Sequence, residues 1–370
     1  TSVFGFYTLI SRVLGYLRDI LIAIFLGTTI YADAFFVAFR LPNTFRRLFA
    51  EGTFNAAFIP SYAKANLKNK KEGKKFADEV FNLLLYILIF IIIIVEIFTP
   101  VVVYLIAPGF YDDNEKLNLA VEFTRITFPF LLFVSLSSML SGILNTNNKF
   151  AAAAAAPIVL NIVLIFSLLL AFNLELNIAK SLSVGVTLSG IIQFLILIFF
   201  TKKFYFPSLK ISFEFKKNVK NFFKKLLPSI FSAGITQINI LVGTIIASFQ
   251  TGAVSYLYYA DRIYQINLAI AGIAVGTVVL PNLSKKIKEK NKNSINTLQN
   301  KSLELSLALS LPAAFGLFIA SKEIVSSLFG YGSFTQDDVR NTSLALMYFA
   351  LGVPAFALIK VLSSFYFARD

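Results

Sequence analysis

Residues 11–52 read SRVLGYLRDILIAIFLGTTIYADAFFVAFRLPNTFRRLFAEG, two apolar segments of membrane length in which charged side chains recur. The charged residues are Arg12, Arg18, Asp19, Asp33, Arg40, Arg46, Arg47 and Glu51. A charge at the centre of a bilayer costs about 2.5 to 3.5 kcal/mol on insertion scales, so five uncompensated arginines would cost roughly 12 to 18 kcal/mol. The stretch therefore predicts helices whose charged faces line a hydrated interior instead of contacting lipid.

The composition indicates an all-α protein that crosses a membrane several times. Of its 370 residues, 57% are hydrophobic, and apolar runs such as LLLYILIFIIIIVEIF at 83–98 are long enough to span hydrocarbon. The sequence contains no Cys and no His, so it lacks the thiol and imidazole groups that act as nucleophiles and as the usual ligands of zinc and copper. We expect a protein that is not an enzyme and that uses no metal or cofactor.

The net charge of +14 is concentrated in a few connections between apolar segments. Of the 34 Lys and Arg residues, 19 fall in three connections, with six Lys in 64–75, eight in 202–225 and five in 285–292. The alternate connections carry acids, namely Asp112, Asp113, Glu115, Glu175, Asp337 and Asp338. This alternation is the positive-inside pattern, which places the Lys-rich connections and the N-terminus in the cytoplasm beside anionic lipid. Membrane lipids, and no nucleic acid, are the expected partners.

Ten transmembrane spans are expected. They lie near residues 3–26, 32–62, 77–106, 118–145, 150–172, 178–201, 222–249, 254–283, 299–329 and 338–367. We assign residues 1–203 to an N-terminal lobe with six spans, residues 204–221 to a basic cytoplasmic linker, and residues 222–370 to a C-terminal lobe with four spans.

An internal repeat supports the division into two lobes. The segment that begins at Leu105 resembles the one that begins at Leu328, and Asp113 is separated from Asp338 by 225 residues. Parallel repeats of this kind build two lobes about an axis along the membrane normal, with a central cavity whose opening can alternate. Because the second copy holds fewer spans than the first, we expect the natural chain to continue beyond Asp370.

The charges of the second span are regularly spaced. Asp33, Arg40 and Arg47 are seven residues apart and Glu51 follows by four, so a straight helix would place them on one face. Pro42 is expected to kink this helix. The stripe is consistent with an ion-pair ladder that joins helices and also with part of a ligand site, and the residues alone leave both open.

The arginines of residues 11–52 outnumber the acids by two, since five Arg face three acidic residues. Arg262, beside Asp261, adds a cation without net charge. A guanidinium group has the planar fork that suits phosphate and carboxylate. We therefore expect a doubly negative cargo, although any single arginine can instead reach lipid headgroups by snorkelling.

Polar amides also lie within the apolar spans, where side chains of this type usually form hydrogen bonds between helices. The four amides in question are Asn161, Gln193, Gln237 and Asn239. Interhelical bonding is the expectation for all four, and the last two are also candidates to line the cavity.

Several runs carry a family resemblance. They are SRVLGYLRD at 11–19, ADAFFVAFRLPNTFRRLFAEGTFNAAFIP at 32–60, APGF at 107–110, ITFPFLLFVSLSSMLSGILNTNNKF at 126–150, SYLYYADRIYQ at 255–265 and GTVVLPNLSK at 276–285. Together they resemble the MurJ (MviN) family, the lipid II flippases of the multidrug/oligosaccharidyl-lipid/polysaccharide exporter superfamily. The resemblance extends over the whole chain. It implies a fold of fourteen helices, the last four of which would lie beyond Asp370.

The resemblance also implies roles for the charged residues. In the family, essential arginines face a cationic central cavity, and these positions fall here on Arg12, Arg18, Arg46 and Arg262. The residues expected to support the cavity charge are Asp33, Arg40, Arg47 and Glu51.

The implied function is translocation of lipid II by alternating access across the bacterial cytoplasmic membrane, driven by membrane potential or a coupling cation. The nearest alternatives are a flippase for another polyprenyl-diphosphate-linked glycan and a cation-coupled drug antiporter of the same superfamily. An organic cation would suit acids in the cavity better than an excess of arginine. A membrane enzyme acting on polyprenyl phosphates, or an inert scaffold, are the alternatives from other classes.

Overall fold

The computed structural model describes residues 2–50, 53–209, 237–268 and 292–367, together with residues 222, 224 and 226. These residues form helices and short connections, and no strand occurs among them, which confirms the predicted all-α class. The chain divides into two compact units. Unit 1 comprises residues 1–22 and 29–254, and unit 2 comprises residues 23–28 and 255–370.

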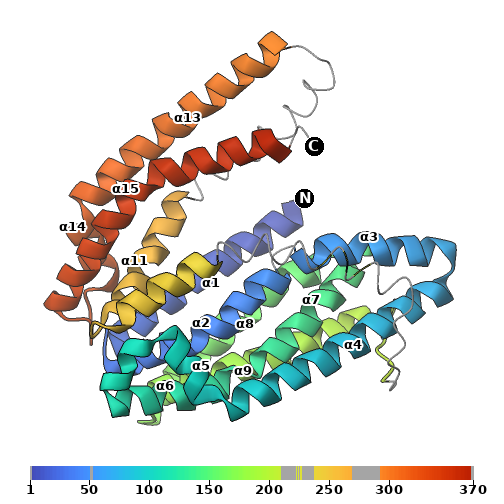
Figure 1. Cartoon of the computed structure of the whole chain (residues 1–370), viewed down its shortest axis with the longest axis horizontal. Coiled ribbons are helices and arrows are strands. Elements are labelled where there is room, and N and C mark those ends of the chain that lie inside the picture. The colour runs from blue at the N-terminus through green and yellow to red at the C-terminus, as the bar shows by residue number, and fades with distance from the viewer. Residues whose placement is uncertain are drawn as a thin grey trace. The chain divides into compact units, whose positions relative to one another are not determined.

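Unit 1 holds most of the described helices (Figure 1). Its elements are α1 (Ser2–Leu26), whose last turn belongs to unit 2, α2 (Ile30–Ala50), α3 (Thr53–Lys68), α4 (Lys70–Ile97), α5 (Thr99–Ile106), the 3₁₀ helix η1 (Pro108–Asp112), α6 (Asn114–Thr127), α7 (Phe130–Thr146), α8 (Phe150–Asn173), α9 (Ile178–Thr201) and the helix Gln237–Ser248. Unit 2 contains α11 (Ala253–Leu268) apart from its first two residues, α13 (Lys292–Ile319), α14 (Ser321–Phe329) and α15 (Gln336–Phe367).

Six helical segments of the described chain are long and apolar enough to cross a membrane. They are Lys70–Ile97, Asn114–Thr146, Phe150–Asn173, Ile178–Thr201, Ile295–Ile319 and Gln336–Ser363. Each of them overlaps one of the predicted spans. The predicted spans at 222–249 and 254–283 lie partly outside the described residues, so the number ten stays a prediction.

Prolines explain where two of the predicted spans divide. The predicted span at 77–106 consists of two helices, α4 and α5, that meet at Phe98. Pro100 follows in the first turn of α5, and a proline lacks the backbone N–H and its ring clashes with the carbonyl group four residues earlier, which interrupts a continuous helix. Pro129 likewise separates α6 from α7. Pro42, by contrast, lies inside α2 without ending it.

Polar side chains fix where three helices begin. Asn69 accepts a hydrogen bond from the backbone N–H of Lys71 at the start of α4 (3.0 Å), and Asp113 accepts one from Lys116 at the start of α6 (3.1 Å). Asn177 does the same at the start of α9. The first N–H groups of a helix have no partner within the helix, so such caps stabilise its N-terminus by about 1 kcal/mol.

The segment that contains α6 and α7 lies at the centre of unit 1, and α4 lies at its rim. In the most apolar 18-residue window of Asn114–Thr146, 72% of the residues are buried, whereas the corresponding share for Lys70–Ile97 is 28%. The exposed face of α4 carries Phe90, Ile93 and Ile97. An exposed apolar face on a membrane-length helix is suited to contact with lipid.

An aromatic cluster joins α3, α4 and residue 222. The ring of Phe58 stacks on those of Tyr62 and Phe76, with centroid distances of 5.6 and 5.9 Å. Phe222 packs edge-on against Phe54 at 5.5 Å and is almost fully buried. Such ring pairs contribute about 0.5 to 1.5 kcal/mol beyond the apolar area they bury. Residue 222 is thereby held in the core of unit 1.

The segment that follows α9 is bound to α4. The hydroxyl of Tyr205 and the backbone N–H of Ser208 both donate to Asp78, at 2.9 and 3.1 Å, and Asn82 donates to the carbonyl oxygen of Ser208 at 2.8 Å. Burial raises the pKa of the Tyr205 hydroxyl, and the negative charge of Asp78 raises this pKa further. These contacts fix residues 205–208, the first part of the predicted linker. Its remainder lies mostly outside the described residues, and the lobe boundary stays a prediction.

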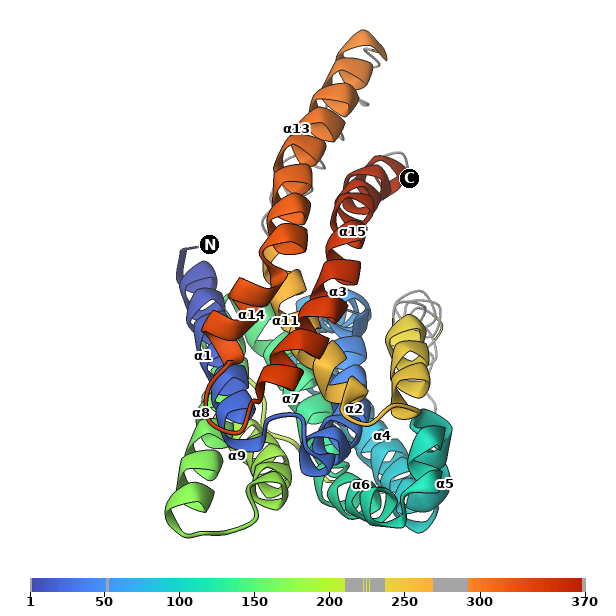
Figure 2. The same ribbon diagram turned by 90° about the vertical axis from the view of Figure 1, so that its left-hand side faces the viewer.

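In unit 2, α13 and α15 pack side by side (Figure 1, Figure 2). The turn at residues 23–28 is built into this unit by hydrogen bonds. Tyr259 donates to the carbonyl oxygen of Gly27 (3.0 Å), the N–H of Ser333 donates to the carbonyl oxygen of Ile24 (2.7 Å), and the hydroxyl of Thr28 donates to Asp338. The last turn of α1 is therefore fixed by residues that lie more than 200 positions later in the chain.

Candidate functional site

Arg18 is the most completely described of the predicted substrate-binding arginines. It lies on α1, where its Nε and Nη2 atoms donate to Oδ1 of Asp19 at 3.0 and 2.6 Å. Its Nη1 atom donates to Oδ1 of Asn161 on α8 at 2.9 Å. The exposed fractions of the three residues are only 5%, 2% and 5%. The guanidinium group is thus buried and paired with a carboxylate and an amide.

Asn161 reaches α1 because the helices approach closely at Gly15. The side-chain Nδ2 of Asn161 donates to the carbonyl oxygen of Ser11 at 2.9 Å. A Cβ atom on Gly15 would lie 3.4 Å from that same nitrogen. The prediction that Asn161 forms an interhelical hydrogen bond is therefore confirmed. Its particular partners, the backbone of Ser11 and the side chain of Arg18, were not predicted.

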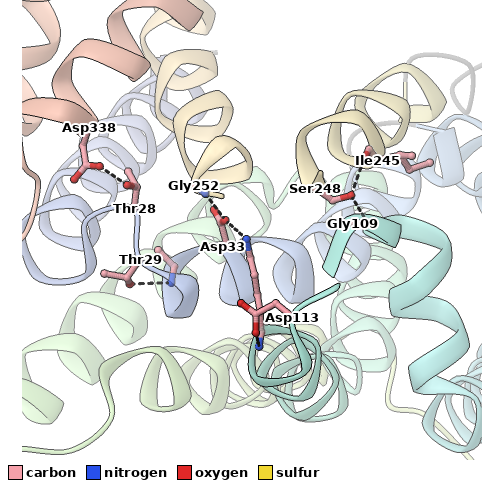
Figure 3. A network of polar contacts seen from close by, with 11 residues as sticks. Thr28, Thr29, Asp33, Gly109, Asp113, Ile245, Ser248, Gly252 and Asp338 are labelled. Carbon is pink, nitrogen blue, oxygen red and sulfur yellow. Dashed lines mark hydrogen bonds and ion pairs between the residues drawn. The ribbon is translucent and has the colours of Figure 1, made fainter. Parts of the chain in front are cut away.

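Asp33 forms a second buried ion pair in unit 1 (Figure 3). Its Oδ2 atom accepts from Nζ of Lys116 on α6 at 2.6 Å and from the backbone N–H of Gly252 at 2.9 Å. Asp33 is fully buried, and Lys116 is 4% exposed with its ammonium group 4.2 Å from the ring centroid of Phe110. Asp33 also lies in the first turn of α2, where the helix dipole favours a negative charge.

The contact between η1 and the helix Gln237–Ser248 adjoins this pair. The backbone N–H of Gly109 donates to the hydroxyl of Ser248 at 2.9 Å (Figure 3). A Cβ atom on Gly109 would lie 2.4 Å from the backbone of Ser248, so only glycine fits this position of the APGF run.

The other predicted residues of unit 1 are described less completely. Arg12 is exposed on α1, and Arg40 is partly buried on α2 with a polar partner of its own. Arg46 and Arg47 lie near the end of α2, but their side chains are outside the described part of the structure. Glu51 falls between α2 and α3, outside the described residues.

Arg262 lies on α11 in unit 2. Its Nη2 atom donates to the hydroxyl of Tyr258 at 3.0 Å, and its guanidinium carbon lies 4.7 Å from the centroid of the Tyr258 ring. The adjacent Asp261 accepts a hydrogen bond from Gln265. Stacking on an aromatic face is a typical way to hold a guanidinium group that is only half-buried.

The structure therefore places Arg18 in an ion pair with its neighbour in sequence and Asp33 in an ion pair with another helix. Lys116 was not predicted as a partner of Asp33. It lies 83 positions later in the sequence, beside the acidic residues of a connection that was expected to be a solvated loop. Among the described residues, no group of three or more acidic side chains is arranged to hold a metal ion.

Six candidate spans, together with one buried ion pair within α1 and another between α2 and α6, define a multi-pass helical membrane protein with a charged interior. Comparison with known proteins identifies the family. The family model described as lipid II flippase MurJ matches residues 22–370. The chain belongs to the lipid II flippase MurJ family.

Relatives and solved structures agree with this assignment. A probable lipid II flippase MurJ of Rhizobium tropici is 42% identical over 372 residues, which cover 99% of this chain and 70% of that protein. The lipid II flippase MurJ of Burkholderia cenocepacia is 34% identical and is covered to 72% of its length.

A solved structure of lipid II flippase MurJ in an inward closed conformation matches the chain with a TM-score of 0.87 at 29% identity, covering 100% of this chain and 76% of that one. An inward-facing multidrug transporter of the MATE family has a TM-score of 0.72 at 13% identity, which shows a shared fold.

Proposed function

We propose that this protein translocates lipid II, the undecaprenyl-diphosphate-linked precursor of peptidoglycan, from the inner to the outer leaflet of the bacterial cytoplasmic membrane. No bond is made or broken, so the protein acts as a transporter and not as an enzyme. The observation that carries the proposal is a buried guanidinium group, that of Arg18, within a membrane-length helix of a chain from this family. Ionisable residues at such positions usually mark the path of a charged substrate.

The proposed binding residues for the diphosphate are Arg12, Arg18, Arg46 and Arg262. A diphosphate offers several oxygens in the geometry that arginine forks bind in pairs. The residues proposed to support the charge of the cavity are Asp33, Arg40, Arg47 and Glu51. For Asp33 this support is structural, since its charge and that of Lys116 compensate each other within a buried contact between α2 and α6.

The proposed orientation places the N-terminus and the Lys-rich connections in the cytoplasm. The six lysines between residues 64 and 75 are all exposed around the junction of α3 and α4. Positive charge in short connections is retained on the cytoplasmic side during insertion. Membrane lipids with anionic headgroups are the proposed neighbours of these lysines.

The proposed transport cycle is alternating access between an N-terminal lobe, residues 1–203, and a C-terminal lobe, residues 222–370, around a central cationic cavity. Release of the diphosphate from arginine requires a driving force, for which membrane potential and a coupling cation are both suitable. A potential of about 100 mV is worth about 2.3 kcal/mol for each elementary charge moved.

The test is a translocation assay in proteoliposomes with fluorescent lipid II. The wild-type protein is expected to move the lipid between leaflets, and Arg46→Ala and Arg262→Ala are each expected to abolish this movement while the protein stays folded. The matched control is Lys64→Ala, which removes a positive charge from an exposed residue that is not among the proposed binding residues. Full activity of both arginine variants would overturn the site, and no translocation by the wild type would overturn the function.

A further inference from the structure

The hydrogen bonds of Arg18 occupy the side of its guanidinium group that a diphosphate would use. Nε and Nη2 form the edge that binds two-oxygen acceptors in parallel, and both atoms point at Asp19. The resulting pair has an N···O distance of 2.6 Å and side chains that are 6% and 3% exposed. Because this edge is taken and covered, a phosphate oxygen that binds at this edge has to replace the carboxylate.

The pairing is unusual for two neighbours in a helix. Residues at positions i and i+1 point in directions about 100° apart and do not normally face each other. Here Asn161 accepts a hydrogen bond from Nη1 of the same guanidinium group at 2.9 Å. Since Asn161 is itself anchored to the carbonyl oxygen of Ser11 on α1, it holds Arg18 against the side of its own helix.

We propose that Asp19 is an internal counter-ion that exchanges with the diphosphate of the cargo, and that Asn161 positions Arg18 for this exchange. Asp19 leaves the guanidinium group when the diphosphate binds and returns to it when the diphosphate leaves. The inference rests on the proposed function, because it requires a phosphate-bearing cargo at Arg18.

The exchange would solve a problem of charge burial. A buried guanidinium group without a partner is strongly unfavourable, so a site that held its cargo only by Arg18 would release it slowly. With Asp19 available, the number of charge-assisted hydrogen bonds to Arg18 stays nearly constant whether cargo is present or absent. Asn161 is neutral and does not compete with the diphosphate as an anion. The two residues should therefore affect binding in opposite directions.

The experiment compares Asp19→Asn with Asn161→Ala, using undecaprenyl diphosphate as the binding probe for the purified protein in nanodiscs. Asp19→Asn removes the competing charge, so binding is expected to tighten about tenfold, which is the effect of one charged hydrogen bond of about 1.4 kcal/mol. Asn161→Ala leaves Arg18 less well placed, so binding is expected to weaken about tenfold. Asp113→Asn is the matched control, because it removes one negative charge from an exposed helix cap that Asn can also form.

Transport kinetics with fluorescent lipid II separate the exchange from a structural effect. For Asp19→Asn, both KM and kcat are expected to fall, because the cargo binds more tightly and leaves more slowly. For Asn161→Ala, KM is expected to rise. A purely structural role for the pair predicts weaker binding in both variants, and that result would overturn the inference.

A measurement on the wild-type protein covers the case in which Asp19→Asn does not fold. The Nε–H signal of Arg18 in a nitrogen-15 NMR spectrum, assigned with Arg18→Lys, is expected to shift when undecaprenyl diphosphate binds, because its acceptor changes. An unchanged signal in protein that has bound the probe would overturn the exchange while leaving the proposed function intact. Absence of probe binding by the wild type would instead overturn both.

Discussion

The buried pair of Asp33 and Lys116 makes a prediction about stability. Lys116→Met keeps the length of the side chain and removes its charge, which leaves the fully buried carboxylate of Asp33 without its ammonium partner at 2.6 Å. Removing one partner of a buried ion pair costs about 3 to 5 kcal/mol. The dipole of α2 offsets about 0.3 to 1 kcal/mol of this cost. We expect a net loss of about 3 kcal/mol.

The assay is the thermal unfolding of the purified protein, followed by intrinsic tyrosine fluorescence. A loss of this size corresponds to a decrease in Tm of about 4 °C, because the entropy of unfolding is about 2.1 cal/mol/K per residue and the chain has 370 residues. The double variant Asp33→Asn with Lys116→Met removes both charges and keeps an acceptor for the N–H of Gly252. It is expected to regain most of the lost stability.

The matched control is an ion pair of the same length at an exposed position. Lys180 and Glu122 are 2.7 Å apart, with side chains that are 55% and 44% exposed. Exposed pairs contribute about 0 to 1 kcal/mol, so Lys180→Met is expected to change Tm by no more than about 1.5 °C. A decrease in Tm for Lys116→Met that is no larger than the one for Lys180→Met would refute the reasoning.

Two further predictions concern the connections between helices. Gly27→Ala is expected to destabilise the protein by about 1 to 3 kcal/mol. Gly27 has a φ of +58°, and an added Cβ would lie 2.4 Å from the carbonyl oxygen of Ser333. An unchanged Tm would contradict this prediction. Asp78→Ala removes the acceptor of Tyr205 and Ser208, so hydrogen exchange of the backbone amides of Tyr205, Phe206 and Ser208 is expected to accelerate about tenfold. Equal protection in the variant and the wild type would show that these hydrogen bonds do not fix the segment.

The sequence predicted the helical class and most helix positions because apolar runs and prolines act locally. A single span was predicted at 77–106, and it contains the apolar run at 83–98. Its division at Phe98 follows from Pro100, a local signal that the prediction did not use. The caps at Asn69 and Asp113 are local signals as well, since each acceptor and its donor lie within three residues, but they were not predicted.

The partners of the buried charges could not be predicted in the same way. Spacing along a helix shows which residues share a face, but it carries no information on which other helix covers that face. Asp33 therefore seemed to belong with Arg40 and Arg47, whereas its partner Lys116 arrives from α6. Asn161 was predicted to form an interhelical hydrogen bond. That its partner is Arg18 could not be predicted, because this contact depends on how α8 packs on α1 at Gly15.

The identity of the cargo is the central claim, and native mass spectrometry of the lipid that co-purifies with the protein tests it most directly. The account predicts a bound species with the mass of undecaprenyl-diphosphate-linked disaccharide pentapeptide, which is lost in Arg18→Gln. A different polyprenyl-diphosphate glycan bound in its place, or lipid II retained equally by Arg18→Gln, would contradict the account.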